Sequence, residues 1–312
     1  MSKYSYVVAS NERYLPLLNA FLNSLEYVGN KQDVHLISWN LPTSYFKQLS
    51  QLGYSVIVHE VSNEPRFKEL GEGDVLMRYR YELASNLTEY ESVVVFDADS
   101  IVVRNLDLFF EIAAKANVII GVVLEQKRWY GREENHKVDG KHIIPETWNE
   151  KDIACSPLFF NPKEFGKVFS YSWHIFADYP PEKRFKAPDM DALNIAILKF
   201  GVQNRILELP EAPWSGLHET LLKPFSYICE LHNKLFTING EPIFVIHGQF
   251  NSSLWRQWQI EGQLRCIDRE LDSSPRCKKI SRECLEFLTS YWEKMSKFKL
   301  KLTQEEKSNK IE

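Results

Sequence analysis

Short apolar runs alternate with segments of helical periodicity through the first half of the chain, and this alternation limits the possible fold most strongly. The apolar runs predict strands at Ser5–Ala9, Val34–Ser38, Ser55–His59, Ser92–Phe96 and Val118–Leu124. Apolar residues at helical spacing, together with caps and stops, predict helices from Leu15 to Gly29, from Thr43 as a cap to Gly53, over Val75–Asn86 and over Leu106–Ala116. Strands that alternate with helices predict a parallel sheet with helices on both faces.

The strands are apolar along nearly their whole length, as expected when helices cover both faces of a sheet. We therefore expect an α/β protein with a Rossmann-like fold, built on a central mixed, mostly parallel sheet that is flanked by helices. One domain is expected over residues 1–260, followed by a C-terminal helical extension over residues 261–312. Ligands of such sheets bind beyond the C-terminal ends of the strands. The residues that follow each apolar run are thus the first candidates for function.

The composition excludes several classes of protein. The chain has 312 residues, of which 44% are hydrophobic and 26% charged, and its formal net charge of −4 gives no electrostatic basis for nucleic-acid binding. No apolar run approaches the roughly 18 residues that span a bilayer, and the polar start does not predict a signal peptide. The five cysteines contain no C-x-x-C pair, so we expect reduced thiols in a cytoplasmic protein and no zinc site.

The strongest strand signal, Ser92–Phe96, leads directly into Asp97-Ala98-Asp99. Two carboxylates at the end of a buried strand repel each other and are costly to desolvate, and a divalent cation removes that cost. Oxygen ligands suit Mg²⁺ or Mn²⁺, which are usually shared with substrate phosphates. The alternative is an Asx turn in which both acids cap backbone amides. The position between a buried strand and a second apolar run favours the metal.

Two further motifs have a structural and a functional interpretation. His247 follows a strand predicted over Pro242–Ile246, where a neutral imidazole can bind a metal, although a lone histidine is more often structural. Asp189 and Asp191 lie in the first turn of a helix predicted over Pro188–Lys199, where acids interact favourably with the helix dipole. Those acids can instead face a substrate, and the residues alone leave both alternatives open.

The segment Tyr90–Phe109 resembles the D-x-D block of nucleotide-sugar glycosyltransferases, most closely family 8, the group of glycogenin and the bacterial lipopolysaccharide galactosyltransferases. In that family a strand, the D-x-D, a second apolar run and an Asn/Asp-Leu-Asp-x-Phe helix start follow in this order. The segment Val7–Pro16 is similar to the first strand and nucleotide loop of the family, and Asp189–Asn194 is similar to its D-Q-D-x-L-N block. The resemblance implies a GT-A fold, Mn²⁺ or Mg²⁺ as cofactor, and transfer of a sugar from a nucleoside-diphosphate sugar, expected to be UDP-linked.

The resemblance also implies roles for individual residues. The implied groups are Asp97, Asp99 and His247 as metal ligands, Ala9, Ser10, Tyr14, Arg80, Asp97, Ala98 and Asp99 in donor binding, and Asp189 and Asp191 as the catalytic acids that position the donor sugar. Tyr14 would stack on the uracil, and the planar guanidinium of Arg80 suits a phosphate or a carboxylate. If the likeness extends to stereochemistry, the anomeric configuration of the sugar is retained.

The sequence departs from the family pattern at three places. Met190 replaces the glutamine of the D-Q-D block, Ala154–Pro157 replaces an Asn and Gly that approach the sugar, and the Lys-Pro that follows the late histidine is absent, although Trp255 is present. These departures keep a non-catalytic carbohydrate-binding or scaffolding protein as an alternative. A sugar-phosphate nucleotidyltransferase is a weaker one, because it needs a glycine-rich loop after the first strand. Cys155 has no basic neighbour in sequence, so we do not expect a nucleophile there.

Two segments fall outside the resemblance. Gln126–Lys151 is polar and aromatic with weak periodicity, which is typical of a long loop or lid over a site. Tyr291–Leu302 mixes aromatic residues with lysines, which suits peripheral attachment to an anionic membrane. A helix packed on the domain with solvated lysines is the alternative. The sequence does not identify the acceptor, which would be a carbohydrate, a lipid-linked sugar or a protein.

Overall fold

The structure is a computed structural model of the 312-residue chain. It describes residues 2–67, 70–124, 137–138, 141–142, 152–177, 188–210, 214, 229–231, 234–236 and 242–247. The C-terminal extension, Trp255, and the Gln126–Lys151 segment apart from the short strands β7 (Lys137–Val138) and β8 (Lys141–His142) lie outside these ranges. The predictions made for them are therefore not tested.

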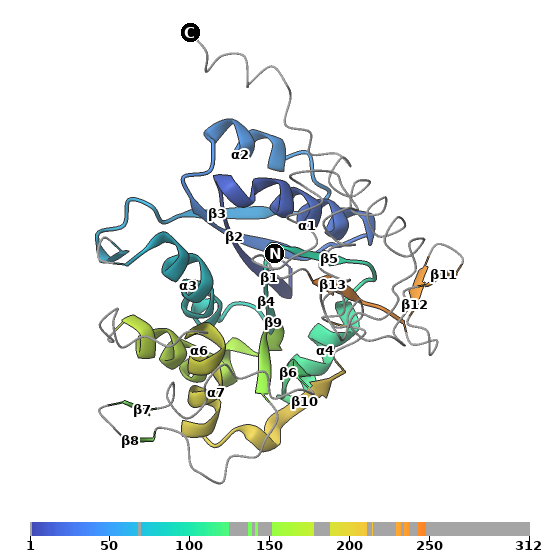
Figure 1. Cartoon of the computed structure of the whole chain (residues 1–312). Coiled ribbons are helices and arrows are strands. Elements are labelled where there is room, and N and C mark those ends of the chain that lie inside the picture. The colour runs from blue at the N-terminus through green and yellow to red at the C-terminus, as the bar shows by residue number, and fades with distance from the viewer. Residues whose placement is uncertain are drawn as a thin grey trace, which may run out of the picture.

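A seven-stranded sheet forms the centre of the protein (Figure 1). Its strands are ordered β10 (Ile206–Leu209), β6 (Ile119–Leu124), β9 (Asp152–Phe160), β4 (Ser92–Phe96), β1 (Tyr4–Asn11), β2 (Asp33–Trp39) and β3 (Val56–Glu60). β9 runs antiparallel to both of its neighbours, and the other pairs of strands are parallel. The predicted mixed, mostly parallel sheet is confirmed.

Helices cover both faces of the sheet. The helices α1 (Leu15–Tyr27), α2 (Thr43–Leu49) and α4 (Asp107–Ala116) pack into one core, and α3 (Glu72–Asn86), α6 (Pro162–Ala177) and α7 (Pro188–Lys199) pack into the other (Figure 1). The central strand β1 contributes Tyr6 and Val8 to the first core and Val7 to the second. Successive side chains of a strand point to opposite faces, so two covered faces require a continuous apolar run.

A second, smaller pairing brings a distant part of the chain to the end of β4. The strand β5 (Ser100–Val102) pairs antiparallel with β13 (Val245–His247), and residue 247 lies directly opposite Ser100. The backbone N–H of Val102 donates to the buried hydroxyl of Ser24, 3.0 Å away, which ties β5 to α1. The remaining short strands, β11 (Cys229–Leu231) and β12 (Lys234–Phe236), pair only with each other among the described strands.

Three local features differ from the sequence expectations. Thr43 is the first residue of α2 rather than its cap, which is Pro42, so no side chain caps this helix. α6 has no counterpart among the predicted helices, and β9 has none among the predicted strands. The register of β9 against β6 shifts between Ile153 and Leu158, so Pro157 lies in a bulge, the type of position where proline is tolerated inside a sheet.

In the parts of the chain that the structure describes, no helix combines the length and the apolar character needed to cross a membrane.

Candidate metal and donor site

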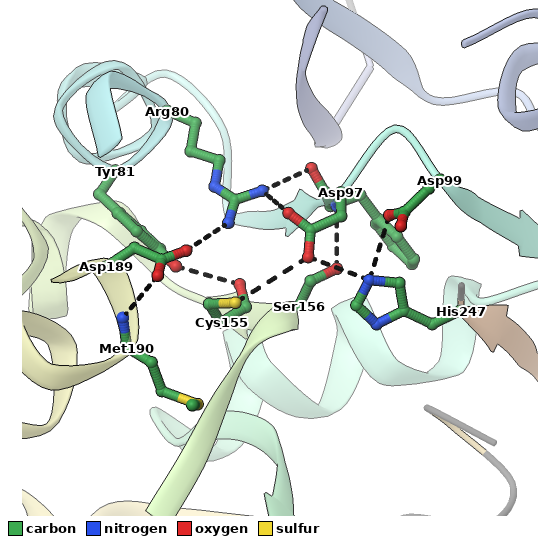
Figure 2. A network of polar contacts seen from close by, with 10 residues as sticks. Arg80, Tyr81, Asp97, Asp99, Cys155, Ser156, Asp189, Met190 and His247 are labelled. Atoms are coloured by element: carbon green, nitrogen blue, oxygen red, sulfur yellow. Dashed lines mark hydrogen bonds and ion pairs between the residues drawn. The ribbon is translucent and has the colours of Figure 1, made fainter. Parts of the chain in front are cut away.

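The two acids of the D-x-D lie on the turn between β4 and β5, and the β5–β13 pairing brings His247 to them (Figure 2). The Nε2 atom of His247 is 3.2 Å from Asp97 Oδ2 and 3.2 Å from Asp99 Oδ1. One potential ligand atom from each of the three residues lies within 4.8 Å of the other two. The three side chains are largely buried, with exposed fractions of 22%, 10% and 14% for Asp97, Asp99 and His247.

The charges of this cluster depend on one another. Burial alone would raise the pKa of Asp97, but the nearby Arg80 and His247 outweigh it and hold this pKa well below its usual range. Burial raises the pKa of Asp99, and the charge of Asp97 adds to the effect. Burial would lower the pKa of His247, but the two carboxylates raise it to about 10. The acids therefore require a positive charge between them, which the imidazole supplies by holding a proton.

These three residues fit a hard divalent cation. Two carboxylate oxygens and one imidazole nitrogen converge, and a cation among them would take over the neutralising role of the histidine proton. Mg²⁺ and Mn²⁺ prefer such oxygen-rich ligands and keep further positions for substrate oxygens or water. The donor set therefore agrees with the predicted Mn²⁺ or Mg²⁺ site, and it does not by itself select between the two ions.

Arg80 of α3 connects this cluster to a third acid. Its guanidinium is only 3% exposed and forms ion pairs with Asp97 and, at 3.3 Å, with Asp189 Oδ2 (Figure 2). It also donates to the backbone oxygen of Phe96 at 3.2 Å. Burial would lower the pKa of Arg80, but the surrounding anionic groups, led by Asp97, raise it well above its usual value. Arg80 therefore carries a permanent charge that orients both acids.

Asp189 opens α7, and the packing of this helix on β9 fixes its position. The side chain of Asn194 accepts from the N–H of Ile153 and donates to its carbonyl, both at 3.1 Å, and it also donates to Met190 O at 2.8 Å. The side chain of Met190 extends away from Asp97 and packs against the first core (Figure 2). Asp191 lies in the same turn of α7, and its side chain is outside the described part of the structure.

The bulge of β9 supplies two contacts that the sequence reasoning missed. The backbone N–H of Asp97 donates to Ser156 Oγ at 2.9 Å, and the Cys155 thiol lies 3.9 Å from Asp97 Oδ2. Burial and the nearby acids raise the pKa of Cys155 well above its usual value, so the thiol stays protonated, in agreement with the expectation that it is not a nucleophile. The one available signal for Ser156 was a serine before a proline within an otherwise apolar run.

The residues predicted to bind the nucleotide lie at the same edge of the sheet. β1 runs parallel to β4 with Val8 opposite Phe96, so Ala9 and Ser10 extend past the pairing toward the side where the D-x-D begins. Ser10 is buried, and Tyr14 closes a 3-10 turn in which its N–H donates to Asn11 Oδ1 at 3.0 Å. The structure thus joins Arg80 with Asp97, Asp99, Asp189 and His247, four of the predicted site residues, in one contact network.

The architecture is a mixed sheet in which an acidic pair follows a central strand, and a later strand brings a histidine beside that pair. No protein-family model matches the sequence, and a search of curated proteins gives no significant match. Two solved glycosyltransferases are similar in structure. One is the galactosyltransferase LgtC, determined with donor and acceptor sugar analogues, at a TM-score of 0.57 and 13% identity over 97% of this chain and 99% of that one.

The other is the apo form of the glycosyltransferase GlyE from Streptococcus pneumoniae TIGR4, at a TM-score of 0.57 and 14% identity over 99% of this chain. The chain spans 64% of the length of the GlyE structure. At these identities the likeness shows a common fold, and the predicted fold class is confirmed.

Proposed function

We propose that the protein is a metal-dependent glycosyltransferase that moves a sugar from a nucleoside-diphosphate sugar, expected to be UDP-linked, to a carbohydrate, lipid-linked or protein acceptor. The single observation that carries the proposal is the position of the His247 imidazole, 3.2 Å from each acid of the D-x-D at the ligand-binding edge of the sheet. Two structurally similar proteins are glycosyltransferases, which supports the proposed class of reaction.

A bound Mn²⁺ or Mg²⁺ would neutralise the charge that develops on the leaving nucleoside diphosphate. Asp97, Asp99 and His247 would hold this ion. Arg80 keeps Asp97 ionised and its carboxylate oriented, because the guanidinium contacts both this acid and Asp189 in a largely water-excluded place. The protein thereby supplies a site whose charges are fixed before the donor binds.

The remaining site residues would bind the two ends of the donor. Ala9, Ser10 and Tyr14 would hold the nucleotide at the end of β1, and Ala98 would approach the donor between the two acids. Asp189 and Asp191 would position the sugar at the start of α7. We expect retention of the anomeric configuration, and because Met190 lacks the amide carbonyl of a glutamine, the configuration of the product is best measured directly by NMR spectroscopy.

The test is turnover of a panel of UDP- and GDP-sugars, followed by release of the nucleoside diphosphate with Mn²⁺ and with a chelator. We expect release from at least one donor, loss of activity in the chelator, and loss of activity in Asp97→Asn. Asp107→Asn is the matched control, because this acid accepts a hydrogen bond from Gln32, 2.9 Å away, and among the described residues it lies outside the contact network. A protein that binds a donor and never releases the diphosphate would instead be a carbohydrate-binding protein.

The C-terminal segment Tyr291–Leu302 is a separate part of the proposal, as a surface for peripheral attachment to an anionic membrane. Salt-sensitive binding to vesicles that contain an anionic lipid, lost on truncation after Ser290, would support it. Equal binding of the truncated and full-length chains would indicate that the lysines of this segment are only solvated.

A further inference from the structure

Ser100 is a buried polar residue whose hydroxyl has no hydrogen-bond partner among the described residues. Its side chain is only 1% exposed. A buried hydroxyl without a partner is unfavourable, and nearly all such groups in folded proteins bond to protein or to an ordered molecule. The position therefore needs an explanation.

The surroundings of Ser100 favour an apolar side chain. Residues 100 and 102 of β5 lie directly opposite residues 247 and 245 of β13, so these four side chains share one face of the pair of strands. Two of the four, Val102 and Val245, are fully buried in the first core. Alanine or valine at position 100 would continue this apolar face without burying an unpaired hydroxyl.

The one polar neighbour on that face is His247. Directly opposed residues of an antiparallel pair have Cβ atoms about 5 Å apart, so Ser100 is a direct neighbour of the histidine whose imidazole contacts both acids. Ser100 also directly follows Asp99 in the chain. Residue 100 thus follows one of the groups that we assign to the ion in the chain and lies opposite another across the strand pair.

We propose that the Ser100 hydroxyl is a positioning group of the metal site, which hydrogen-bonds a water molecule in the coordination shell of the ion. This inference rests on the proposed metal-dependent function. Three protein ligands leave a hard cation with further positions for water and substrate oxygens, and a bound water needs a partner for its protons. A hydroxyl can accept from that water and donate onward, whereas the two valines of this face cannot. Groups that hydrogen-bond to the ligands of a metal ion orient those ligands, and they commonly affect the affinity of the protein for the metal.

The experiment compares Mn²⁺ binding and thermal stability in Ser100→Ala, Ser100→Thr and Ser172→Ala. Mn²⁺ binding is measured by EPR titration, and the melting temperature is measured in chelator. Ser100→Ala should weaken Mn²⁺ binding by about tenfold. Its melting temperature in chelator should stay the same or rise, because the variant no longer buries an unpaired hydroxyl. Ser100→Thr keeps the hydroxyl and should bind Mn²⁺ like the wild type.

Ser172→Ala is the matched control. Ser172 is also 1% exposed, but its hydroxyl donates to Phe169 O at 2.6 Å within α6, away from the contact network. This variant should lose thermal stability and keep the Mn²⁺ affinity of the wild type.

The outcomes separate this inference from the proposed function. If the wild type binds Mn²⁺ and Ser100→Ala binds it equally well, the inference is wrong and the metal site stands. Loss of affinity in Ser100→Thr equal to that in Ser100→Ala would also overturn it, because the hydroxyl would not be the cause. If the wild type itself binds no Mn²⁺, the proposed metal site fails first.

Discussion

Replacement of Arg80 by methionine should destabilise the metal-free protein by about 3–5 kcal/mol at pH 7, the usual cost of removing one partner from a buried ion pair. The guanidinium is 3% exposed and contacts Asp97 and Asp189, whose side chains are 22% and 15% exposed. Methionine has a similar length and fills much of the space, but it offers no charge to either acid. Asp189 would then lose its cation, and Asp97 would keep only His247 as a positively charged partner.

The stability that Arg80→Met loses should depend on pH in a defined direction. In the wild type, the charges around Asp97 outweigh the effect of burial and keep its pKa below the unfolded value of about 3.9, so its contribution to stability is constant above that value. Without Arg80, only His247 opposes the effect of burial, and this pKa rises. The Asp97 carboxylate of the folded variant then takes up a proton on mild acidification, which restores part of the stability lost with Arg80. The difference in unfolding free energy between wild type and variant should therefore shrink as the pH falls from 7 to 5.

The assay is urea denaturation in chelator at pH 7, 6 and 5. Lys115→Met is the control: the ion pair of Lys115 with Glu111 measures 2.9 Å, but the two side chains are 76% and 45% exposed. Such surface pairs contribute at most about 1 kcal/mol. An Arg80→Met variant whose stability at pH 7 is within 1 kcal/mol of the wild type, or whose loss is the same at all three pH values, would refute the reasoning.

Two further predictions concern a positioning contact and acid stability. Ser156→Ala removes the acceptor of the Asp97 N–H at 2.9 Å, so it should cost about 1–3 kcal/mol in urea denaturation and weaken Mn²⁺ binding by the folded protein; wild-type Mn²⁺ affinity would contradict a positioning role. Burial, together with the neighbouring His59, lowers the pKa of His35 to about 4, so the folded protein resists a protonation that the unfolded chain accepts near pH 6.5. Stability should therefore be complete above pH 6.5 and decline toward pH 4 by up to about 3 kcal/mol, and His35→Gln should flatten this profile; parallel profiles for wild type and variant would show that other groups cause the decline.

The sequence predicted the parts of the site that follow from local pattern. Asp97 and Asp99 were found because a buried strand ends directly before them, a relation contained in a few consecutive residues. Asp189 was placed correctly at the start of its helix, which begins at Pro188 as predicted. For His247 the local pattern left two interpretations. The reason for its position is the pairing of β13 with β5, a contact between segments far apart in the sequence.

The remaining parts depend on tertiary structure. β9 contains Ser156-Pro157, a pair that argues against a central strand, and only its bulge between two neighbours accommodates the proline and turns Ser156 toward Asp97. The helix α6 did carry signals, with proline at its first position and Phe165, Phe169 and Trp173 at intervals of one turn, all buried in the second core. α6 is therefore predictable from local pattern, unlike β9.

The most direct test of the metal site is a crystal structure grown with Mn²⁺ and UDP, with anomalous diffraction recorded at the manganese absorption edge. We predict one strong anomalous peak within bonding distance of carboxylate oxygens of Asp97 and Asp99 and of the imidazole of His247. Crystals of active protein at saturating Mn²⁺ that show no peak there, or only a peak elsewhere on the chain, would contradict the assignment of these three residues to the ion.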